Sequence, residues 1–256
     1  MVKHTLRSWL DLARLAEKVA GDDWIFRGES SARNPLRPGA GRVGQELRAP
    51  RRAKFSEADE RAALDRFKND ALPYLSHRPA MDRNLEWLAI AQHHGMQTRL
   101  LDWTESLLIA AFFAVERADV AGPGVIYGVR GLPVVEGGAD PFSIEQVSVY
   151  RPSHITPRIA PQWSVFTIHP KPVEDFRTSS VVAQWRLPAA RSRRQIKRVL
   201  DSCGINYASI YPDLTGLARH IYWRYKWGMG QAKSLPAPAS ANRAFRRKAG
   251  DRGSVP

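Results

Sequence analysis

The chain has a single cysteine, Cys203, which excludes an internal disulfide framework and a cysteine-rich metal site. It also lacks a long hydrophobic run: the longest apolar stretch, residues 106–115, is far shorter than the roughly 18 residues that cross a bilayer. Charged residues interrupt residues 1–19 where a signal peptide would be apolar. We therefore expect a cytoplasmic protein with no membrane partner.

Acidic residues are scarce relative to basic ones. The 256 residues include 39 Lys and Arg but 25 Asp and Glu, so the formal net charge is +14. Residues 229–256 carry +5 of this charge, which leaves +9 on the rest. A positive field favours polyanions, so we expect nucleic acid or nucleotide as a partner. The alternative is that the charge serves solubility and a basic tail.

Apolar periodicity predicts helices and strands interspersed without regular alternation, which indicates an α+β fold. We expect a single domain of mixed helices around a small central sheet: an N-terminal helix in 1–20, the domain in 21–227 and a disordered basic tail in 228–256. The predicted helices cover residues 5–20, 56–75, 84–94, 105–117, 190–204 and 213–227. The predicted strands cover residues 24–28, 124–130, 164–169 and 180–187. Residues 31–54 read as an irregular segment, whose Arg side chains either contact phosphates or are solvated.

The stretch WIFRGES (24–30) places a permanent charge at the end of an apolar strand. Arg27 follows three apolar residues that read as buried. Gly28 comes next, and a glycine permits a turn or a close approach of another group to the backbone. A guanidinium at such a position is suited to binding a phosphate through two parallel hydrogen bonds.

Polar residues also gather in 92–104, directly before the apolar helix. They are Gln92, His93, His94, Gln97, Thr98, Arg99, Asp102, Trp103 and Thr104. Asp102 has capping-box spacing with Glu105, so it either caps that helix or belongs to a site. Arg99 could pair with Asp102 across the turn. The adjacent histidines and the absence of an HxxxH motif argue against a metal.

These motifs together resemble the FRG domain, a family named after a Phe/Tyr-Arg-Gly motif. The resemblance runs over residues 20–220 and includes Phe26-Arg27-Gly28. Its central element is similar to the family's Gln-His-aromatic-Gly-x-Pro-Thr-Arg-Leu-Leu-Asp-Trp-Thr, with departures at His94 and Gln97. Two later matches are the stretches at 162–167 and 212–218.

The resemblance implies a bacterial or phage-associated protein, of phage-defence or toxin type. A strand that ends in aromatic-Arg-Gly is also similar to the first strand of ADP-ribosyltransferase-like folds, in which the Arg binds NAD. Such enzymes need a carboxylate as well. The strand at 180–187 offers Gln184 and no Glu, so Glu29, Asp102 and Glu105 are the possible substitutes.

We expect the two motifs to converge on one polar cleft. The candidate catalytic residues are Arg27, His93, Arg99 and Asp102. The candidate cofactor-binding residues are Arg27, Gly28, Glu29, Thr98, Thr104, Gln162 and Thr167, with NAD as a possible substrate and no metal. Three hypotheses stay open: an enzyme that uses NAD or another nucleotide, a non-catalytic module that binds nucleic acid or nucleotide, and a motif that only holds the fold.

Overall fold

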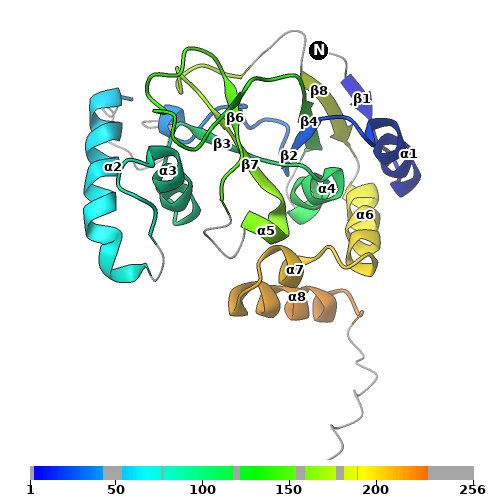
Figure 1. Cartoon of the computed structure of the whole chain (residues 1–256). Helices are drawn as coiled ribbons and strands as arrows, with labels where there is room; N and C mark the ends of the chain where they lie inside the picture. The colour runs from blue at the N-terminus through cyan, green and yellow to red at the C-terminus, as the bar shows by residue number, and fades with distance from the viewer. Residues whose placement is uncertain are drawn as a thin grey trace, which may run out of the picture.

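An eight-stranded mixed sheet forms the centre of the molecule (Figure 1). The structure is a computed structural model, and it describes residues 3–42, 54–75, 78–117, 122–153, 159–176, 182–188 and 190–229. The strand order is β1-β8-β4-β2-β3-β7-β6-β5, with β1–β8 and β5–β6 parallel and the other neighbours antiparallel. The strands are β1 (Lys3–Thr5), β2 (Ile25–Glu29), β3 (Leu100–Thr104), β4 (Gly124–Val129), β5 (Val134–Val135), β6 (Ser148–Tyr150), β7 (Ser164–Ile168) and β8 (Val182–Leu187).

Helices surround this sheet, and the α+β fold is confirmed. In Figure 1, α2 and α3 lie on one side of the molecule, α1 and α6 on the other, and α7 and α8 below. The six predicted helices are present with slightly shorter bounds. The α-helices are α1 (Trp9–Val19), α2 (Glu57–Ala71), α3 (Asn84–His93), α4 (Leu107–Glu116), α5 (Ile159–Gln162), α6 (Ala190–Ser202), α7 (Tyr207–Ile210) and α8 (Leu214–Lys226), and short 3₁₀ turns are η1 (Ala40–Arg42) and η2 (Leu72–Tyr74).

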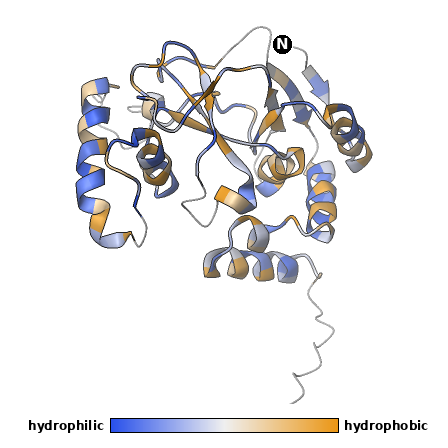
Figure 2. Ribbon diagram, viewed as in Figure 1, coloured by the Kyte–Doolittle hydropathy of each residue, from blue (hydrophilic) through white to orange (hydrophobic). Residues whose placement is uncertain are grey.

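Helix α4 is the centre of the main hydrophobic core. It is apolar on all sides (Figure 2), as expected for a helix that is buried all round. It packs on β2 and β4, while α1 contributes Leu12 and Leu15 to the same cluster. Its N-cap is Ser106, whose hydroxyl accepts a hydrogen bond from the backbone N–H of Ile109. The alternative that Asp102 caps this helix is therefore wrong.

Gly28 permits the close contact between β2 and α4. A Cβ atom built on Gly28 would lie 1.8 Å from the backbone oxygen of Ala110. No side chain fits there, since real carbon and oxygen atoms stay above about 3 Å apart. The close approach that the sequence indicated at Gly28 is thus made by a helix of the protein itself.

Strand β3 was not predicted as a strand, because its sequence LLDWT lies inside the polar stretch 92–104. It pairs over five residues with β7, and Asp102 is opposite Phe166. Its pairing with β2 is much shorter. Both strands are fully described, and only Phe26 and Thr104 are paired between them. The two central strands therefore separate beyond this pair, on the side where Arg27 and Asp102 lie.

Several predictions fall outside the described residues. The basic tail is one of these, apart from residues 228–229, and so is most of the irregular segment after Arg42. Within the described ranges, every helix is too short or too polar to cross a membrane.

Candidate functional site

A cleft of about 700 Å³ opens where β2 and β3 separate. Its walls come from the end of β2, the end of α3, β3, the last turn of α4, and the segments around α5 and α7. Seven of the predicted site residues line it: Arg27, Gly28, Glu29, His93, Asp102, Thr104 and Gln162. The structure thus brings the FRG motif and the second half of the 92–104 stretch together in one cleft, as the sequence predicted.

Arg27 bridges the two separated strands. Its Nη1 donates a hydrogen bond of 2.8 Å to the backbone oxygen of Asp102, and lies 3.6 Å from a carboxylate oxygen of the same residue. Its Nε donates to Oε1 of Glu29 at 3.0 Å, and Nη2 donates to the same oxygen. The side chain is 16% exposed. Burial alone would lower the pKa of Arg27, but Glu29 and Asp102 raise it, so the guanidinium is firmly charged.

Glu29 is the carboxylate that Arg27 holds in the cleft. Its second oxygen, Oε2, accepts a hydrogen bond of 3.0 Å from the amide of Asn34. Burial alone would raise the pKa of Glu29, yet the charge of Arg27 and the hydrogen bonds from Asn34 and Arg27 outweigh it, and the pKa is lowered. Glu29 is therefore an ionised, oriented acid at neutral pH.

Asp102 belongs to a second set of hydrogen bonds, which ties β3 to α3. Gln92 donates to a carboxylate oxygen of Asp102 at 2.8 Å, and its own amide oxygen accepts from the hydroxyl of Thr98. Thr98 in turn accepts from the backbone N–H of Leu100 at 3.1 Å. Asp102 itself is exposed, so its carboxylate faces solvent at the mouth of the cleft.

The remaining cleft residues are held by local contacts. His93 lies at the end of α3, with its ring 4.9 Å from that of His94. The hydroxyl of Thr104 accepts a hydrogen bond from the backbone of Ser106. The amide of Gln162 donates to the backbone oxygen of Ile210 and so connects α5 to α7. These contacts hold this part of the cleft wall in place.

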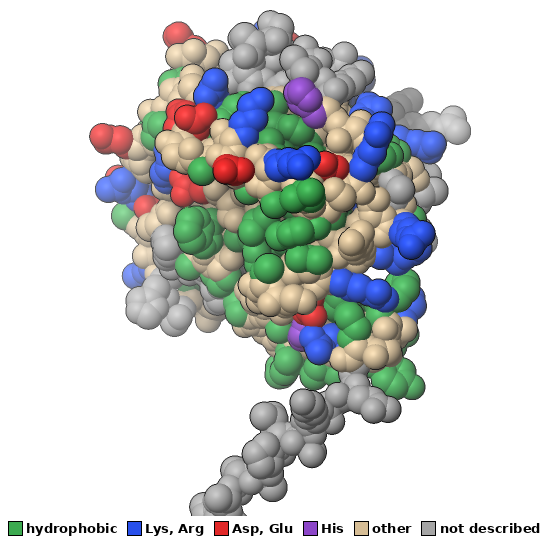
Figure 3. All heavy atoms as spheres, turned by 90° about the vertical axis from the view of Figure 1, so that its right-hand side faces the viewer, with side chains coloured by type: hydrophobic (Ala, Val, Ile, Leu, Met, Phe, Trp, Pro, Cys, Tyr) green, Lys and Arg blue, Asp and Glu red, His purple; other side chains and the backbone are tan. Residues whose placement is uncertain are grey.

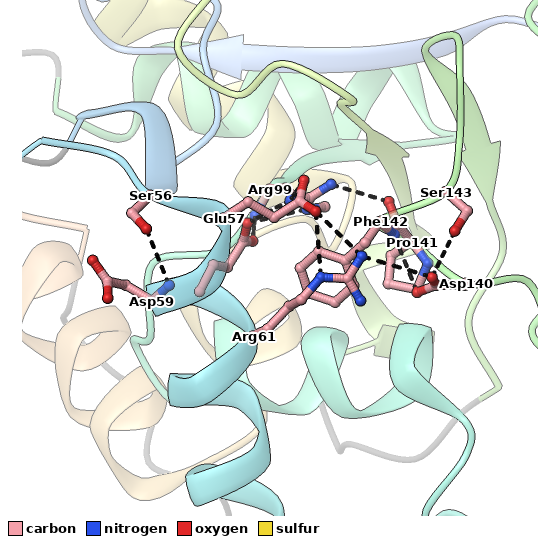
Figure 4. Close-up of polar contacts among 10 residues, drawn as sticks. Ser56, Glu57, Asp59, Arg61, Arg99, Asp140, Pro141, Phe142 and Ser143 are labelled. Atoms are coloured by element: carbon pink, nitrogen blue, oxygen red, sulfur yellow. Dashed lines mark hydrogen bonds and ion pairs between the residues drawn. The ribbon is translucent and has the colours of Figure 1, made fainter.

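Arg99 does not line this cleft. It is fully buried and is bound from three directions in a separate cluster (Figure 4). Its guanidinium pairs with Glu60 at 2.9 Å and Glu57 at 3.0 Å, donates to the backbone of Pro141 and lies 4.2 Å above the ring of Phe142. The expected pair between Arg99 and Asp102 is thus wrong, because Arg99, one residue before β3, pairs with acids of α2 instead.

Thr167 and Thr98 also lie outside the cleft lining, and both are fully buried. The hydroxyl of Thr167 accepts a hydrogen bond from the indole N–H of Trp103 and lies 2.8 Å from Nε2 of His169. Burial, together with the charge of Arg27, lowers the pKa of His169 to about 3. The imidazole is therefore neutral, and these residues support the cleft from behind.

Glu116 and Tyr211 are among the cleft residues that sequence reasoning missed. Glu116, at the end of α4, and Tyr211, after α7, both line the cleft, and the Tyr211 hydroxyl donates to Glu116 at 3.3 Å. Burial raises the pKa of Glu116 despite the positive charges nearby. The signal for it was an acid at the end of an otherwise apolar helix, SLLIAAFFAVE, which is an unusual position for a charge.

A smaller hollow of about 200 Å³ lies beside the cleft and shares Arg27 and Asp102 with it. Arg37 and Arg42, from the irregular segment, also line this hollow. Arg37 pairs with Asp175 at 2.9 Å, while Arg42 donates to the backbone oxygen of Arg37. Burial, and then the charge of Arg27, lower the pKa of Arg42. Three guanidiniums therefore crowd around one small space.

The fold and this site define an α+β domain whose central sheet opens into a polar cleft, which is lined by an Arg–Glu ion pair and by a half-buried acid. Comparison with known families finds one similarity: the FRG domain model matches residues 22–121. The match includes β2, α3, β3 and α4, and ends before the predicted similarities at 162–167 and 212–218. No curated protein and no solved structure matches the chain. No group of three or more His, Cys, Asp or Glu residues in the described ranges could hold a metal.

Proposed function

We propose that this chain is an enzyme that uses NAD or a related nucleotide and acts at its N-glycosidic bond, in the manner of an ADP-ribosyltransferase or glycohydrolase. The observation that carries this proposal is the pair Glu29 and Glu116. Both acids line the same cleft, and their pKa values move in opposite directions. Two carboxyl groups with separated pKa values are the arrangement that acid–base enzymes use to divide two roles.

Each acid has a role in breaking an N-glycosidic bond. As the bond between the ribose C1′ and the base nitrogen breaks, the electron pair leaves with the base and positive charge develops on the ribose. Glu29, ionised and held by Arg27, would stabilise this charge. Glu116 would accept the proton of the water or hydroxyl group that attacks C1′. Arg27 then acts as a positioning residue, because its donors already bind Glu29 and Asp102.

The hollow lined by Arg27, Arg37 and Arg42 supports a phosphate-bearing substrate. Crowded guanidiniums repel each other, and a phosphate between them would relieve that repulsion and accept several hydrogen bonds. Arg27 and Asp102 line both the hollow and the cleft, so the two spaces are adjacent. A dinucleotide could therefore place its phosphates there and its ribose near Glu29.

The decisive experiment follows nicotinamide release from NAD by the purified full chain. We expect release by the wild type and a loss of at least about 100-fold in Glu29→Gln, because one preorganised charge is worth this much. Glu105→Gln is the matched control: Glu105 pairs with Arg151 outside the cleft and should retain activity. Melting temperatures confirm that each variant folds. Absence of base release from NAD and from a panel of nucleotides by the folded wild type would contradict the proposal.

Consumption of NAD inside a cell would stop growth. This effect fits the phage-defence or toxin role that the family resemblance implies, and it fits action in the cytoplasm. Expression of the wild type should then slow bacterial growth and lower cellular NAD. Expression of Glu29→Gln to the same level should do neither. Equal toxicity of the two proteins would mean that the growth effect does not come from chemistry in the cleft.

A further inference from the structure

A second groove, of about 560 Å³, is lined mainly by α6 and α8, and it shares Glu116 and Arg117 with the cleft. Lys and Arg side chains dominate its lining, and aromatic rings provide most of the rest. The lining cations are Arg117, Arg194, Lys197, Arg198, Arg219 and Lys226, and the aromatic residues are Tyr207, Tyr222, Trp223 and Trp227. Figure 3 shows Lys and Arg side chains among hydrophobic ones towards this end of the molecule.

The charge of this groove is almost uncompensated. Glu116 is the one acid in its lining, and its pKa is raised by burial. Five of the six cations form no ion pair with a described carboxylate. The sixth, Lys197, donates to the backbone oxygen of Glu116 and to the hydroxyl of Tyr207. Nearby Arg224 shows the contrast: it pairs with Asp201 at 2.7 Å and does not line the groove.

The aromatic rings are placed for stacking. Tyr222 is 66% exposed, and Trp227 is 38% exposed. The guanidiniums of Arg194 and Arg198 each lie 5.8 Å from the ring centre of Trp227. Lys197 lies 5.3 Å from the ring of Trp223. Exposed rings beside these cations leave both π-faces and positive charge open to one ligand.

We propose that this groove binds single-stranded nucleic acid. A strand offers what the groove lacks: phosphates for the cations and flat bases for the exposed rings. This combination is how single strands are bound without sequence preference. An acidic peptide would use the charges and leave the rings without a role. A duplex would hide its bases from Tyr222 and Trp227. The proposal does not rest on the proposed function of the cleft.

The groove and the cleft meet at Glu116 and Arg117, which line both. A strand bound along α6 and α8 would therefore pass the mouth of the cleft. The net positive charge of the whole chain would attract it there from solution.

The experiment measures the fluorescence anisotropy of a labelled oligothymidine of about 15 nucleotides, a length that spans one such site. The chain offers matched pairs of variants. Tyr222 and Tyr225 are exposed tyrosines of α8, at 66% and 77%, but Tyr225 does not line the groove. Arg194 and Arg191 are exposed arginines of α6, and Arg191 does not line it. Residues 230–256 carry the same charge in every variant.

We expect Tyr222→Ala to weaken binding by about 10-fold or more, and Tyr225→Ala to change it little, because a base stacked on an aromatic ring is lost in the first variant alone. Arg194→Ala should lower the slope of log affinity against log salt concentration by about 0.7, and Arg191→Ala by less. A hairpin duplex of equal charge should bind more weakly than the single strand.

Three outcomes would overturn the proposal. The first is an equal loss of affinity in the groove variants and in their controls, which would mean that the oligonucleotide binds through the overall positive charge of the protein. The second is tighter binding of the duplex. The third is binding to vesicles that contain anionic lipid, with no binding to oligonucleotides at low salt, which would make this surface a membrane contact. Nicotinamide release is measured separately, so failure here leaves the cleft proposal standing.

Discussion

The guanidinium of Arg27 donates a hydrogen bond of 2.8 Å to the backbone oxygen of Asp102, across the gap where β2 and β3 cease to pair. The side chain thus provides a contact that the strand backbones no longer make. The charge at the end of an apolar strand has this structural reason, and a functional one as well. The same guanidinium holds Glu29 ionised in the cleft.

Arg27→Lys should destabilise the fold by about 1–3 kcal/mol, because one ammonium cannot reproduce the bonds to both Glu29 and Asp102. Urea denaturation measures this free energy of unfolding. Arg130→Lys is the control, since Arg130 forms an exposed pair with Asp22, and it should cost less than about 0.5 kcal/mol. Unchanged stability of Arg27→Lys would instead make Arg27 a residue reserved for a ligand.

Arg99→Met should be among the most damaging substitutions, at about 3–5 kcal/mol, because it leaves the buried Glu60 without its partner. Thermal and urea unfolding measure the loss. Arg66→Met removes an exposed pair with Asp70 on the same helix as Glu60 and should cost less than about 1 kcal/mol. The double variant Arg99→Met, Glu60→Met should recover part of the loss. If Arg99→Met matched Arg66→Met in stability, the buried cluster would not hold the fold.

Gly28→Ala should destabilise by roughly 1–3 kcal/mol, because the new methyl group meets the backbone of α4 and overpacks the core. Gly137→Ala is a suitable comparison, since the nearest atoms to its added Cβ would be 3.7 Å away, an ordinary contact. Chemical denaturation of the two variants provides the measurement. Equal effects would mean that α4 can move away from β2 without cost.

The stability of the protein should fall between about pH 6.5 and about pH 3 through His169. Its pKa is about 3 in the folded chain and about 6.5 in the unfolded one, so acid protonates the unfolded state first. The free energy of unfolding then falls as the pH falls, by at most about 1.4 kcal/mol per pH unit.

His169→Gln can keep a hydrogen bond to Thr167 but cannot titrate. Urea denaturation at about pH 7 and about pH 5 should show a smaller loss in this variant than in the wild type. His4→Gln, at an exposed histidine, should behave as the wild type does. A pH dependence that His169→Gln leaves unchanged would contradict this assignment.

Much of the secondary structure follows from the sequence alone. The 3.6-residue period of α1, the Ser56 cap of α2 and the apolar run of α4 each act over a few neighbouring residues, so local patterns report them. The two polar interruptions, around Arg27 and in 92–104, were also visible as places where charge meets an apolar segment. Their meeting in one cleft was predicted for the same reason, because buried charges need partners.

The tertiary structure decides which charged side chains pair with one another. Arg99 and Asp102 are three residues apart in the chain, yet Arg99 pairs with acids of α2 and Asp102 bonds to Gln92 of α3. Glu116 enters the cleft because α4 packs across β2. Gly28, which lies 88 positions before Glu116 in the chain, permits that packing. The sequence by itself determined which groups carry charge and where local segments become helical. Which charges meet, and which pKa values they change, depends on distances between residues far apart in the chain, and these exist only once the sheet has formed.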